Sequence, residues 1–197
     1  MNRFLSVALL SLFALGCNQP TEQLANPKID KLKLPPGFKA EHLYSPEEHE
    51  QGSWVAMTFD HKGRMLTSDQ YGAIYRIELP AVGDTAKVKV EKLIIGSEAD
   101  RSADTTTLKI GMGFAQGLLY AFNSLYVMVN HNSDKNFDKN TGLYRLQDTD
   151  GDDQFDKITL LKSFSGEPGE HGPHSIVLSP DKKSIYISAG NHVDVPK

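Results

Sequence analysis

The sequence contains almost no cysteine: one residue, Cys17, in a chain of 197. No second cysteine exists to form a disulfide within the chain, and no set of thiolates exists to bind a metal ion. The motif C-x-x-C-H, which attaches c-type haem, is also absent. A disulfide framework, a thiolate metal site and a covalently bound haem are therefore excluded for this chain.

An excess of positive charge is the second absence. The 21 lysine and arginine residues are outnumbered by 25 aspartate and glutamate residues, which gives a net charge of −4. Basic and acidic residues are interspersed, and no basic stripe is present. Domains that bind nucleic acid carry a basic patch, so we expect no nucleic-acid partner.

The third absence is an apolar run long enough to span a bilayer, which needs about 20 residues. The longest run, residues 4–15, follows Arg3 and ends before Gly16-Cys17. This order is typical of an export signal. The tetrapeptide "ALGC" resembles a lipobox, with Ala14 where leucine is more usual. Residues 1–17 are therefore predicted to be a lipoprotein signal peptide, with Cys17 as the lipidated residue.

Lipidation of Cys17 predicts an exported protein of the cell envelope, attached to a membrane by its acyl chains on the periplasmic side or at the cell surface. The alternative is an ordinary secretory signal in which the cysteine has no role. The next segment, residues 18–33, is polar and lacks hydrophobic periodicity, so it is predicted to be a flexible tether.

Amphipathic helices are also missing from the rest of the chain, where short β-rich runs are separated by Gly, Asp and Asn. The stretch "FKAEHLY" (38–44) alternates like an edge strand. The later strand-like runs are WVAMTFD, RMLTSD, AIYRIEL, KVKVEKLII, GLLYAF, SLYVMVN, GLYRLQD, KITLLKSF, SIVLS and SIYISAG. This pattern predicts an all-β sandwich, barrel or propeller.

Repetition favours the propeller among these folds. Three segments share one plan, an apolar strand, a tight turn and a second strand, with Phe59, Tyr120 and Leu178 in similar places. The first two segments add closing strands, "IYRI" and "LYRL". Residues 34–197 are therefore predicted to be an incomplete β-propeller of about three blades, the N-terminal portion of a longer protein. The alternative is a complete small sandwich.

Acidic residues gather in "DTDGDDQFD" (148–156), where Asp148, Asp150, Asp152 and Asp156 stand at relative positions 1, 3, 5 and 9. This spacing resembles a calcium-binding loop, because alternating acids in a tight turn converge on a hard cation. Position 12 is Thr159 instead of glutamate, and the flanks are strand-like. The loop is predicted to bind calcium weakly in a structural role, with a polar hairpin turn as the alternative.

Two further polar segments are weaker candidates. The stretch "NHNSDKNFDKN" (130–140) contains His131, Asp134 and Asp138, which would suit a metal ion or simply form a rim loop. The stretch "SDQYG" (68–72) ends a predicted strand, and a structural turn is its favoured interpretation.

Histidines concentrate in "EPGEHGPHS" (167–175), where His171 and His174 lie beside Glu170 in a segment too rich in Gly and Pro for a helix. Histidine titrates near neutral pH and can act as a general base. The alternatives are polar surface residues, or a transition-metal site formed by His171, His174 and His192.

The segment "EHGPHSIVLSPDKKSIYISAGNH" resembles the region around the catalytic histidine of soluble quinoprotein glucose and aldose-sugar dehydrogenases. These are six-bladed propellers that use pyrroloquinoline quinone (PQQ). The resemblance implies that His171 is the base that accepts the hydroxyl proton of the sugar, and it makes His174, Asn191 and His192 candidate cofactor-binding residues. Ser175 departs from the family, which commonly has arginine there, and Asn191 stands where the family has aspartate.

The segments "LPPGFKAEHLY", "EQGSWVAMTFD", "GRMLTSDQYG", "GLYRLQDTDGDDQFD" and "GEHGPHSIVLSPD" together resemble the N-terminal propeller of large secreted proteins of planctomycete and verrucomicrobial type. These are labelled membrane-bound or sorbosone-type dehydrogenases, or haem-binding domain proteins. The resemblance implies oxidation of a sugar or alcohol by the full-length protein, with a cytochrome as electron acceptor, and little activity for this chain alone. The alternative is a non-catalytic scaffold that binds carbohydrate or a protein partner.

Overall fold

The computed structural model describes residues 27–84, 87–96, 112–131, 139–166 and 169–194. The chain separates into two units, Met1–His42 and Leu43–Lys197. In the first unit the described part contains α1 (Pro27–Asp30), a single helical turn within the predicted tether. The predicted signal peptide and Cys17 lie outside the described residues. Within the described ranges, no helix has the length and apolar character needed to cross a membrane.

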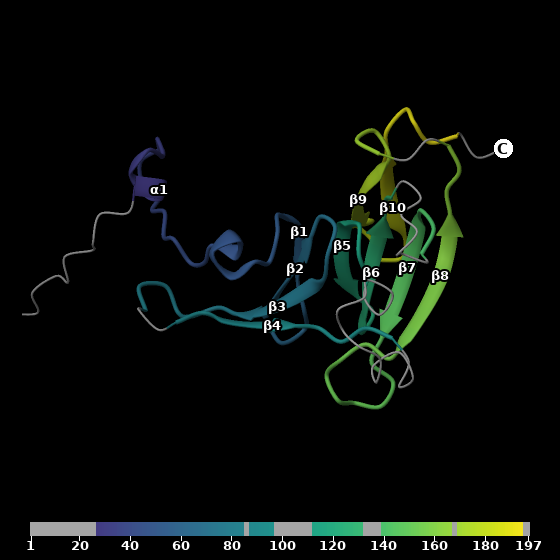
Figure 1. Cartoon of the computed structure of the whole chain (residues 1–197), viewed down its shortest axis with the longest axis horizontal. Helices are drawn as coiled ribbons and strands as arrows, with labels where there is room; N and C mark the ends of the chain where they lie inside the picture. Colours follow the sequence, from purple (N-terminus) through teal and green to yellow (C-terminus); the bar gives the residue numbers. More distant parts are fainter. Residues whose placement is uncertain (1–26, 85–86, 97–111, 132–138, 167–168, 195–197) are drawn as a thin grey trace, which may run out of the picture. The chain divides into compact units, whose positions relative to one another are not determined.

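The second unit is built from three antiparallel sheets (Figure 1). Sheet 1 has the order β1-β2-β3-β4, sheet 2 the order β5-β6-β7-β8, and sheet 3 contains β9 and β10. The strands are β1 (Trp54–Phe59), β2 (Met65–Asp69), β3 (Ile74–Glu78), β4 (Lys89–Lys92), β5 (Ala115–Ala121), β6 (Ser124–Val129), β7 (Gly142–Gln147), β8 (Lys157–Ser163), β9 (Pro173–Leu178) and β10 (Ile185–Ala189). The predicted all-β class is confirmed, and each run from WVAMTFD onward overlaps one of these strands.

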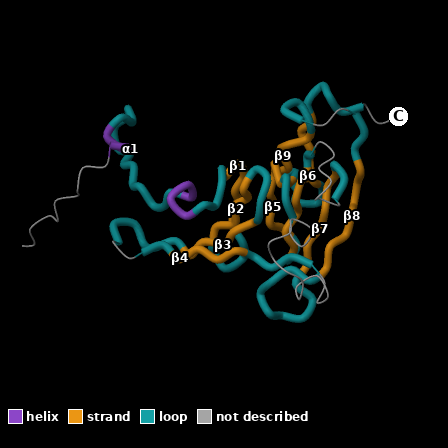
Figure 2. Tube along the Cα trace, in the orientation of Figure 1, coloured by secondary structure: helices purple, strands orange, loops and turns teal. Residues whose placement is uncertain are grey.

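The predicted edge strand at residues 38–44 is wrong, because this segment has no strand pairing. It leads instead into a 3-10 helix, η1 (Pro46–His49), which Figure 2 shows as a short coil. Here the ring of Tyr44 stacks on His49 at 4.7 Å and on Trp54 at 5.4 Å. Alternating apolar residues form a strand only where a neighbouring strand offers backbone pairing. Residues 38–44 pair with no described strand, and the ring of Tyr44 is packed by aromatic stacking instead.

The core consists of two layers, one on each face of sheet 2. The first layer joins sheets 1 and 2 through Leu66, Ile74, Leu118, Leu125 and Val127, among others. The second joins sheets 2 and 3 through Tyr126, Met128, Leu143 and Ile176. Sheet 2 is thus covered on both faces, and every residue of β6 is buried. This explains why "SLYVMV" reads as a continuous apolar run, whereas β1 alternates between half-buried and exposed positions.

Equivalent faces are used at both junctions. Phe59, Tyr120 and Leu178 pair with Met65, Leu125 and Ile185 at the corresponding ends of the first hairpin of each sheet. Counting from these pairs, Leu66 and Tyr126 occupy the same position, and each lies on the face that packs against the following sheet. Within the described residues the three sheets are therefore repeats stacked in one sense, and none of them is closed.

The first strands of the three sheets are the ones that lie next to one another: β1 contacts β5, and β5 contacts β9. Ser68 Oγ donates a hydrogen bond of 2.7 Å to the carbonyl oxygen of Ala115 across the first junction. At the second, a Cβ on Gly117 would lie 1.8 Å from the carbonyl oxygen of His174, so only glycine permits this approach. The starts of β5 and β9 and the residues that follow the second strands β2 and β6 consequently converge at one end of the stack.

Candidate functional site

A cavity of about 570 Å³ lies where the three sheets converge, and we call it the three-sheet cavity. Each sheet contributes residues that precede or follow a strand close to the junctions. Its lining consists of Gln70, Tyr71, Phe114, Gln116, Asn130, His131, Gly169, Glu170 and His174. The volume lies within the range of about 300–1,000 Å³ that is typical of small-molecule sites.

Asn130 holds one wall of this cavity in place. Its side-chain amide donates a hydrogen bond of 2.7 Å to the carbonyl oxygen of Gly169, and its Oδ1 accepts one of 3.1 Å from the Gly169 backbone N–H. A Cβ on Gly172 would lie 2.3 Å from Asn130 Oδ1, so the loop packs directly on this amide. Asn130 is only 6% exposed, and it therefore fixes the loop that leads into β9.

His131 lies beside Asn130 at the end of β6 and is buried, with 8% of its surface exposed. Its ring packs on Phe114, with ring centroids 5.3 Å apart. The sequence marked His131 as a possible metal ligand together with Asp134 and Asp138, but these two aspartates lie outside the described residues. Within the described part, His131 is a wall residue of the cavity.

Of the two histidines in the segment 167–175, His174 lines the three-sheet cavity. Its Nε2 lies 2.8 Å from the carbonyl oxygen of Glu170. A carbonyl oxygen only accepts hydrogen bonds, so Nε2 carries the hydrogen. In the neutral ring, Nδ1 is then the nitrogen with a lone pair, which is the state required of a base or of a hydrogen-bond acceptor for a hydroxyl group.

His171 lies apart from the cavity lining and is exposed. Its Nδ1 is 2.9 Å from Asn191 Oδ1, and its ring stacks on His192 with centroids 4.7 Å apart. The structure therefore brings His171, Asn191 and His192 together and places His174 in another group. The three histidines do not converge on a point: among the described residues, the acidic trio below is the one group of three or more His, Cys, Asp or Glu side chains that does.

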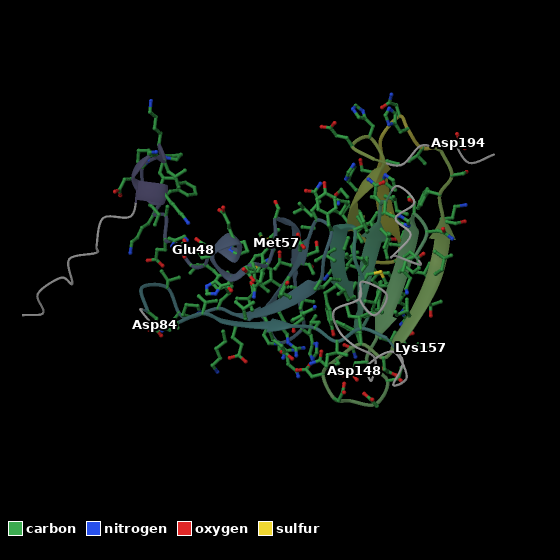
Figure 3. The ribbon with its side chains drawn as sticks, in the orientation of Figure 1. Glu48, Met57, Asp84, Asp148, Lys157 and Asp194 are labelled. Atoms are coloured by element: carbon green, nitrogen blue, oxygen red, sulfur yellow. The ribbon has the colours of Figure 1, made fainter. Side chains whose placement is uncertain are left out.

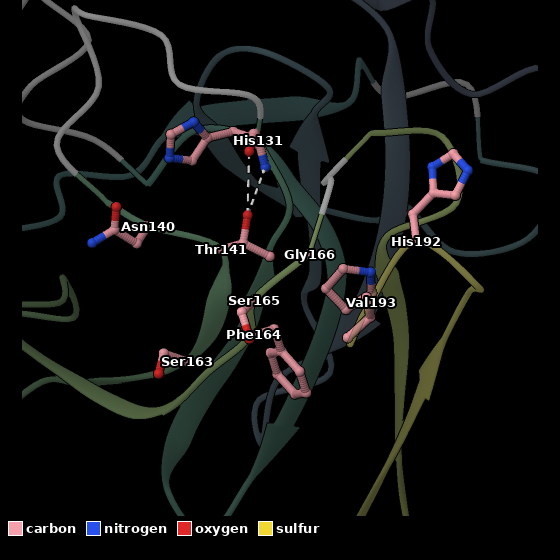
Figure 4. Close-up of a pocket in the computed structure, with 10 residues that line it drawn as sticks. His131, Asn140, Thr141, Ser163, Phe164, Ser165, Gly166, His192 and Val193 are labelled. Carbon is pink, nitrogen blue, oxygen red and sulfur yellow. Dashed lines mark hydrogen bonds between the residues drawn. The ribbon is translucent and has the colours of Figure 1, made fainter. Parts of the chain in front are cut away.

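A second cavity, of about 360 Å³, lies between the ends of β7 and β8 and sheet 3 (Figure 4). Figure 4 shows His131 on one side and His192 on the other, with Thr141 hydrogen-bonded to the His131 backbone. Its lining consists of His131, Asn140, Thr141, Ser163, Phe164, Ser165, Gly166, Pro173, His192 and Val193. His131 thus borders both cavities.

The acidic loop brings three of its four predicted metal ligands together. Oxygens of Asp148, Asp150 and Asp156 lie within 4.8 Å of one another, and Figure 3 labels Asp148 in the loop between β7 and β8. Asp152 is outside this group, and its Oδ1 accepts a hydrogen bond of 2.9 Å from the Gln154 backbone. Three converging carboxylates suit a hard cation such as calcium.

The neighbouring acid, Asp153, takes part in a different interaction, which the sequence did not reveal. Its carboxylate accepts two hydrogen bonds from Arg64, of 2.5 and 2.9 Å, across the junction between sheets 1 and 2. Arg64 also donates to Asp60, and Arg76 donates to the Asp153 carbonyl oxygen. The hydrogen bond to Asp153 raises the pKa of Arg64, and the same hydrogen bond, followed by weaker contributions from Lys62 and Arg76, lowers the pKa of Asp153.

The segment "SDQYG" combines a structural and a site role. Asp69 Oδ1 accepts a hydrogen bond of 3.0 Å from the Ser53 backbone, and both Gly52 and Gly72 pack directly against its carboxylate. Gln70 and Tyr71 then line the three-sheet cavity. Phe114 and Gln116 also line the three-sheet cavity, although the sequence did not indicate them as site residues. Their position at the start of the first strand of a repeat was a usable signal.

The lining does not fit PQQ. This cofactor carries three carboxylates, and among the described residues neither lysine nor arginine lines the three-sheet cavity, where the carboxylate of Glu170 would repel it. The other polar side chains of the lining are amides, a phenol and imidazoles, which suit a neutral ligand with hydroxyl groups.

No known family model matches the chain, and no curated protein matches it significantly.

Proposed function

We propose that this chain forms part of an exported β-propeller that binds a small neutral sugar or alcohol in the three-sheet cavity. The observation that carries the proposal is the cavity itself, which three stacked repeats line with amides, imidazoles, one carboxylate (Glu170) and two aromatic rings, Tyr71 and Phe114. Amides and imidazoles exchange hydrogen bonds with hydroxyl groups, and aromatic rings pack against the apolar face of a sugar.

The propeller assignment draws support from the stacking of the sheets. Each sheet presents an equivalent face to the next, and the first strands β1, β5 and β9 adjoin one another. Such radial repetition is typical of blades, whose first strands surround an axis. The three-sheet cavity then lies at one end of that axis, where propellers commonly bind ligands.

The test of ligand binding is a titration of the purified chain with neutral monosaccharides and glycerol, followed by saturation-transfer NMR. We expect one or more of these compounds to bind, and the variant Gln116→Ala to weaken binding several-fold. Gln147→Ala is the matched control, since Gln147 lines neither cavity described above. Absence of binding by all compounds, or equal loss in both variants, would reject the proposal.

A second candidate is the dehydrogenase activity that the family resemblance implies. It is favoured by the geometry of His174, whose lone pair on Nδ1 is fixed by the Glu170 carbonyl. In this view the proton of the substrate hydroxyl goes to His174, within the cavity, or to His171, as the resemblance implies. The poor fit to PQQ means that the described residues alone do not supply the cofactor site.

The two histidines can be separated by assay. The chain, or a longer form of the protein, is mixed with PQQ, calcium and a sugar, and reduction of a dye or of a cytochrome is followed. Loss of turnover in His174→Ala with retention in His171→Ala would assign the base to the cavity. The reverse result would assign the base to His171. If no sugar supports reduction of the dye or the cytochrome, the dehydrogenase candidate is rejected and the binding function remains.

Attachment to the cell envelope is proposed from the sequence of the leader. Mass spectrometry of the protein from a bacterial host should find acyl chains on Cys17, and Cys17→Ser should release the protein into the soluble fraction. An unmodified Cys17 within a protein cleaved elsewhere would show an ordinary secretory signal instead.

A further inference from the structure

The side chain of His174 takes its hydrogen-bond partner from the turn just before it in the chain. Its Nε2 lies 2.8 Å from the carbonyl oxygen of Glu170. This hydrogen bond exists only while Nε2 carries a hydrogen, because a carbonyl oxygen has none to donate. The position of one backbone carbonyl group therefore determines which nitrogen of the neutral His174 ring is left with a lone pair.

Asn130 supports this turn on both sides of Glu170. On the preceding residue, the Asn130 amide donates a hydrogen bond of 2.7 Å to the Gly169 carbonyl oxygen and accepts one of 3.1 Å from the Gly169 N–H. On the following side, the Gly172 N–H closes the turn with a hydrogen bond of 2.9 Å to the same Gly169 carbonyl oxygen. A Cβ on Gly172 would lie 2.3 Å from Asn130 Oδ1, so both ends of the turn rest on one buried side chain.

The backbone of His174 is placed by other contacts. His174 lies in β9, which pairs with β10, and its carbonyl oxygen packs against Gly117 of β5. Neither of these contacts involves Asn130. Loss of the Asn130 amide should consequently displace the Glu170 carbonyl group while β9 stays in its sheet.

His171, three residues earlier, has the opposite arrangement. Its Nδ1 lies 2.9 Å from Oδ1 of Asn191. An amide oxygen accepts hydrogen bonds, so Nδ1 of His171 carries the hydrogen and Nε2 is left with the lone pair in the neutral ring. Two histidines of one segment thus differ in tautomer, one set directly by Asn191 and the other set through the turn that Asn130 supports.

We propose that Asn130 is a positioning residue for His174. By holding the turn, Asn130 keeps the Glu170 carbonyl oxygen on Nε2, and the ring is left with Nδ1 as a hydrogen-bond acceptor for a ligand hydroxyl group. The use of that lone pair by a ligand rests on the proposed function. The tautomer itself depends only on the contacts above.

The experiment records long-range proton–nitrogen NMR spectra of the purified, isotope-labelled chain at about pH 8, where free histidine is neutral. The chain has seven histidines, and the variant His174→Gln identifies the resonances of His174. In the parent chain we expect the hydrogen on Nε2 of His174, with slowed exchange of that hydrogen with water. In Asn130→Ala this exchange should be about fivefold faster, which corresponds to the loss of one hydrogen bond of about 1 kcal/mol.

A second variant, Gly172→Ala, displaces the turn without removing the amide, because the new Cβ would press on Asn130 Oδ1. It should accelerate exchange at His174 Nε2 in the same way. Asn191→Ala is the matched control, since it should change the ring resonances of His171 and leave those of His174 as they are. The backbone amide resonances of β9 show that each variant is folded.

A hydrogen on Nδ1 of His174 in the parent chain would overturn the proposal without any variant. Unchanged exchange in Asn130→Ala or in Gly172→Ala would overturn it as well. Equal acceleration in Asn191→Ala would do the same, because it would show a general loosening of the segment. The spectra need no ligand, so this inference can fail while ligand binding in the three-sheet cavity holds, and the reverse.

Discussion

The junction between sheets 1 and 2 and the junction between sheets 2 and 3 are held together differently. The first combines an apolar layer with the ion pairs of Arg64, and residues 154 and 155 of the acidic loop hydrogen-bond to the segment after β4. The second combines a smaller apolar layer with the uncharged amide of Asn130. The comparison teaches that two equivalent interfaces in one repeat can have different sensitivity to pH and ions.

The largest effect is expected from the apolar layer of the first junction. Leu125 is fully buried there, and Leu125→Ala should lower the free energy of unfolding by about 3 kcal/mol, through lost burial and the cavity left behind. Leu160→Ala is the control, because Leu160 is 46% exposed and should cost less than about 1 kcal/mol. Urea unfolding measures both, and similar losses in the two variants would contradict the assignment of the core.

At the second junction, Asn130→Ala should cost about 2 kcal/mol, since it removes two partly buried hydrogen bonds to the Gly169 backbone, each worth about 1 kcal/mol. The exposed Asn191→Ala is the matched control and should change stability by less than about 0.5 kcal/mol. We also expect faster hydrogen exchange in the loop before β9. Unchanged exchange there would show that the amide does not hold the loop.

The sequence predicts an interaction well when the residues involved lie close together in the chain, and poorly when they lie far apart. The ten strands from β1 to β10 follow from short β-rich runs and from the turn residues between them. The turn at Asp60 shows why: its Oδ1 accepts hydrogen bonds from the backbone of Lys62 and Arg64, and Gly63 adopts a φ of +77°. A signal of this kind is complete within a few residues.

The contacts between sheets could not be predicted in this way. Arg64 and Asp153 are 89 positions apart, and nothing in either neighbourhood indicates the other. The histidine segment shows the same limit, because His171 and His174 are three residues apart but belong to different groups. Only the packing of β9 on β5 directs His174 to the cavity, at the place where Gly117 allows the backbones to meet.

The ionic part of the first junction should contribute less than its apolar layer. Asp153→Asn removes the charge that Arg64 faces across the sheets, while Asp60 remains as its partner. We expect a loss of about 1 kcal/mol, because about a third of the Asp153 side chain is exposed and solvent weakens the pair. Glu78→Gln, at an exposed pair with Lys89, should show no measurable loss in the same unfolding experiment.

The same carboxylate predicts that the stability of the first junction depends on pH. The pKa of Asp153 is lowered in the folded protein, chiefly by the hydrogen bond from Arg64. Its contribution is therefore fully present above the unfolded pKa of about 3.9 and is lost as pH falls through the lower folded value. Unfolding curves between pH 5 and pH 2 should show a smaller decline for Asp153→Asn than for the parent chain. Parallel declines would exclude this carboxylate as a contributor.

Calcium is expected to have the smallest effect on the free energy of unfolding. Its effect would show whether the acidic loop contributes to the difference between the two junctions. Binding at Asp148, Asp150 and Asp156 would stabilise the chain by about 0.4 kcal/mol at a calcium concentration equal to the dissociation constant. Asp150→Asn should abolish the increase in melting temperature, and Asp152→Asn, outside the converging group, should retain it.

Asp148 Oδ2 accepts a hydrogen bond from the backbone N–H of Asp153, so an ion held here would also position the residue that pairs with Arg64. Calcium should then stabilise Asp153→Asn less than the parent chain, and equal stabilisation of both would mean that the loop and the first junction are independent.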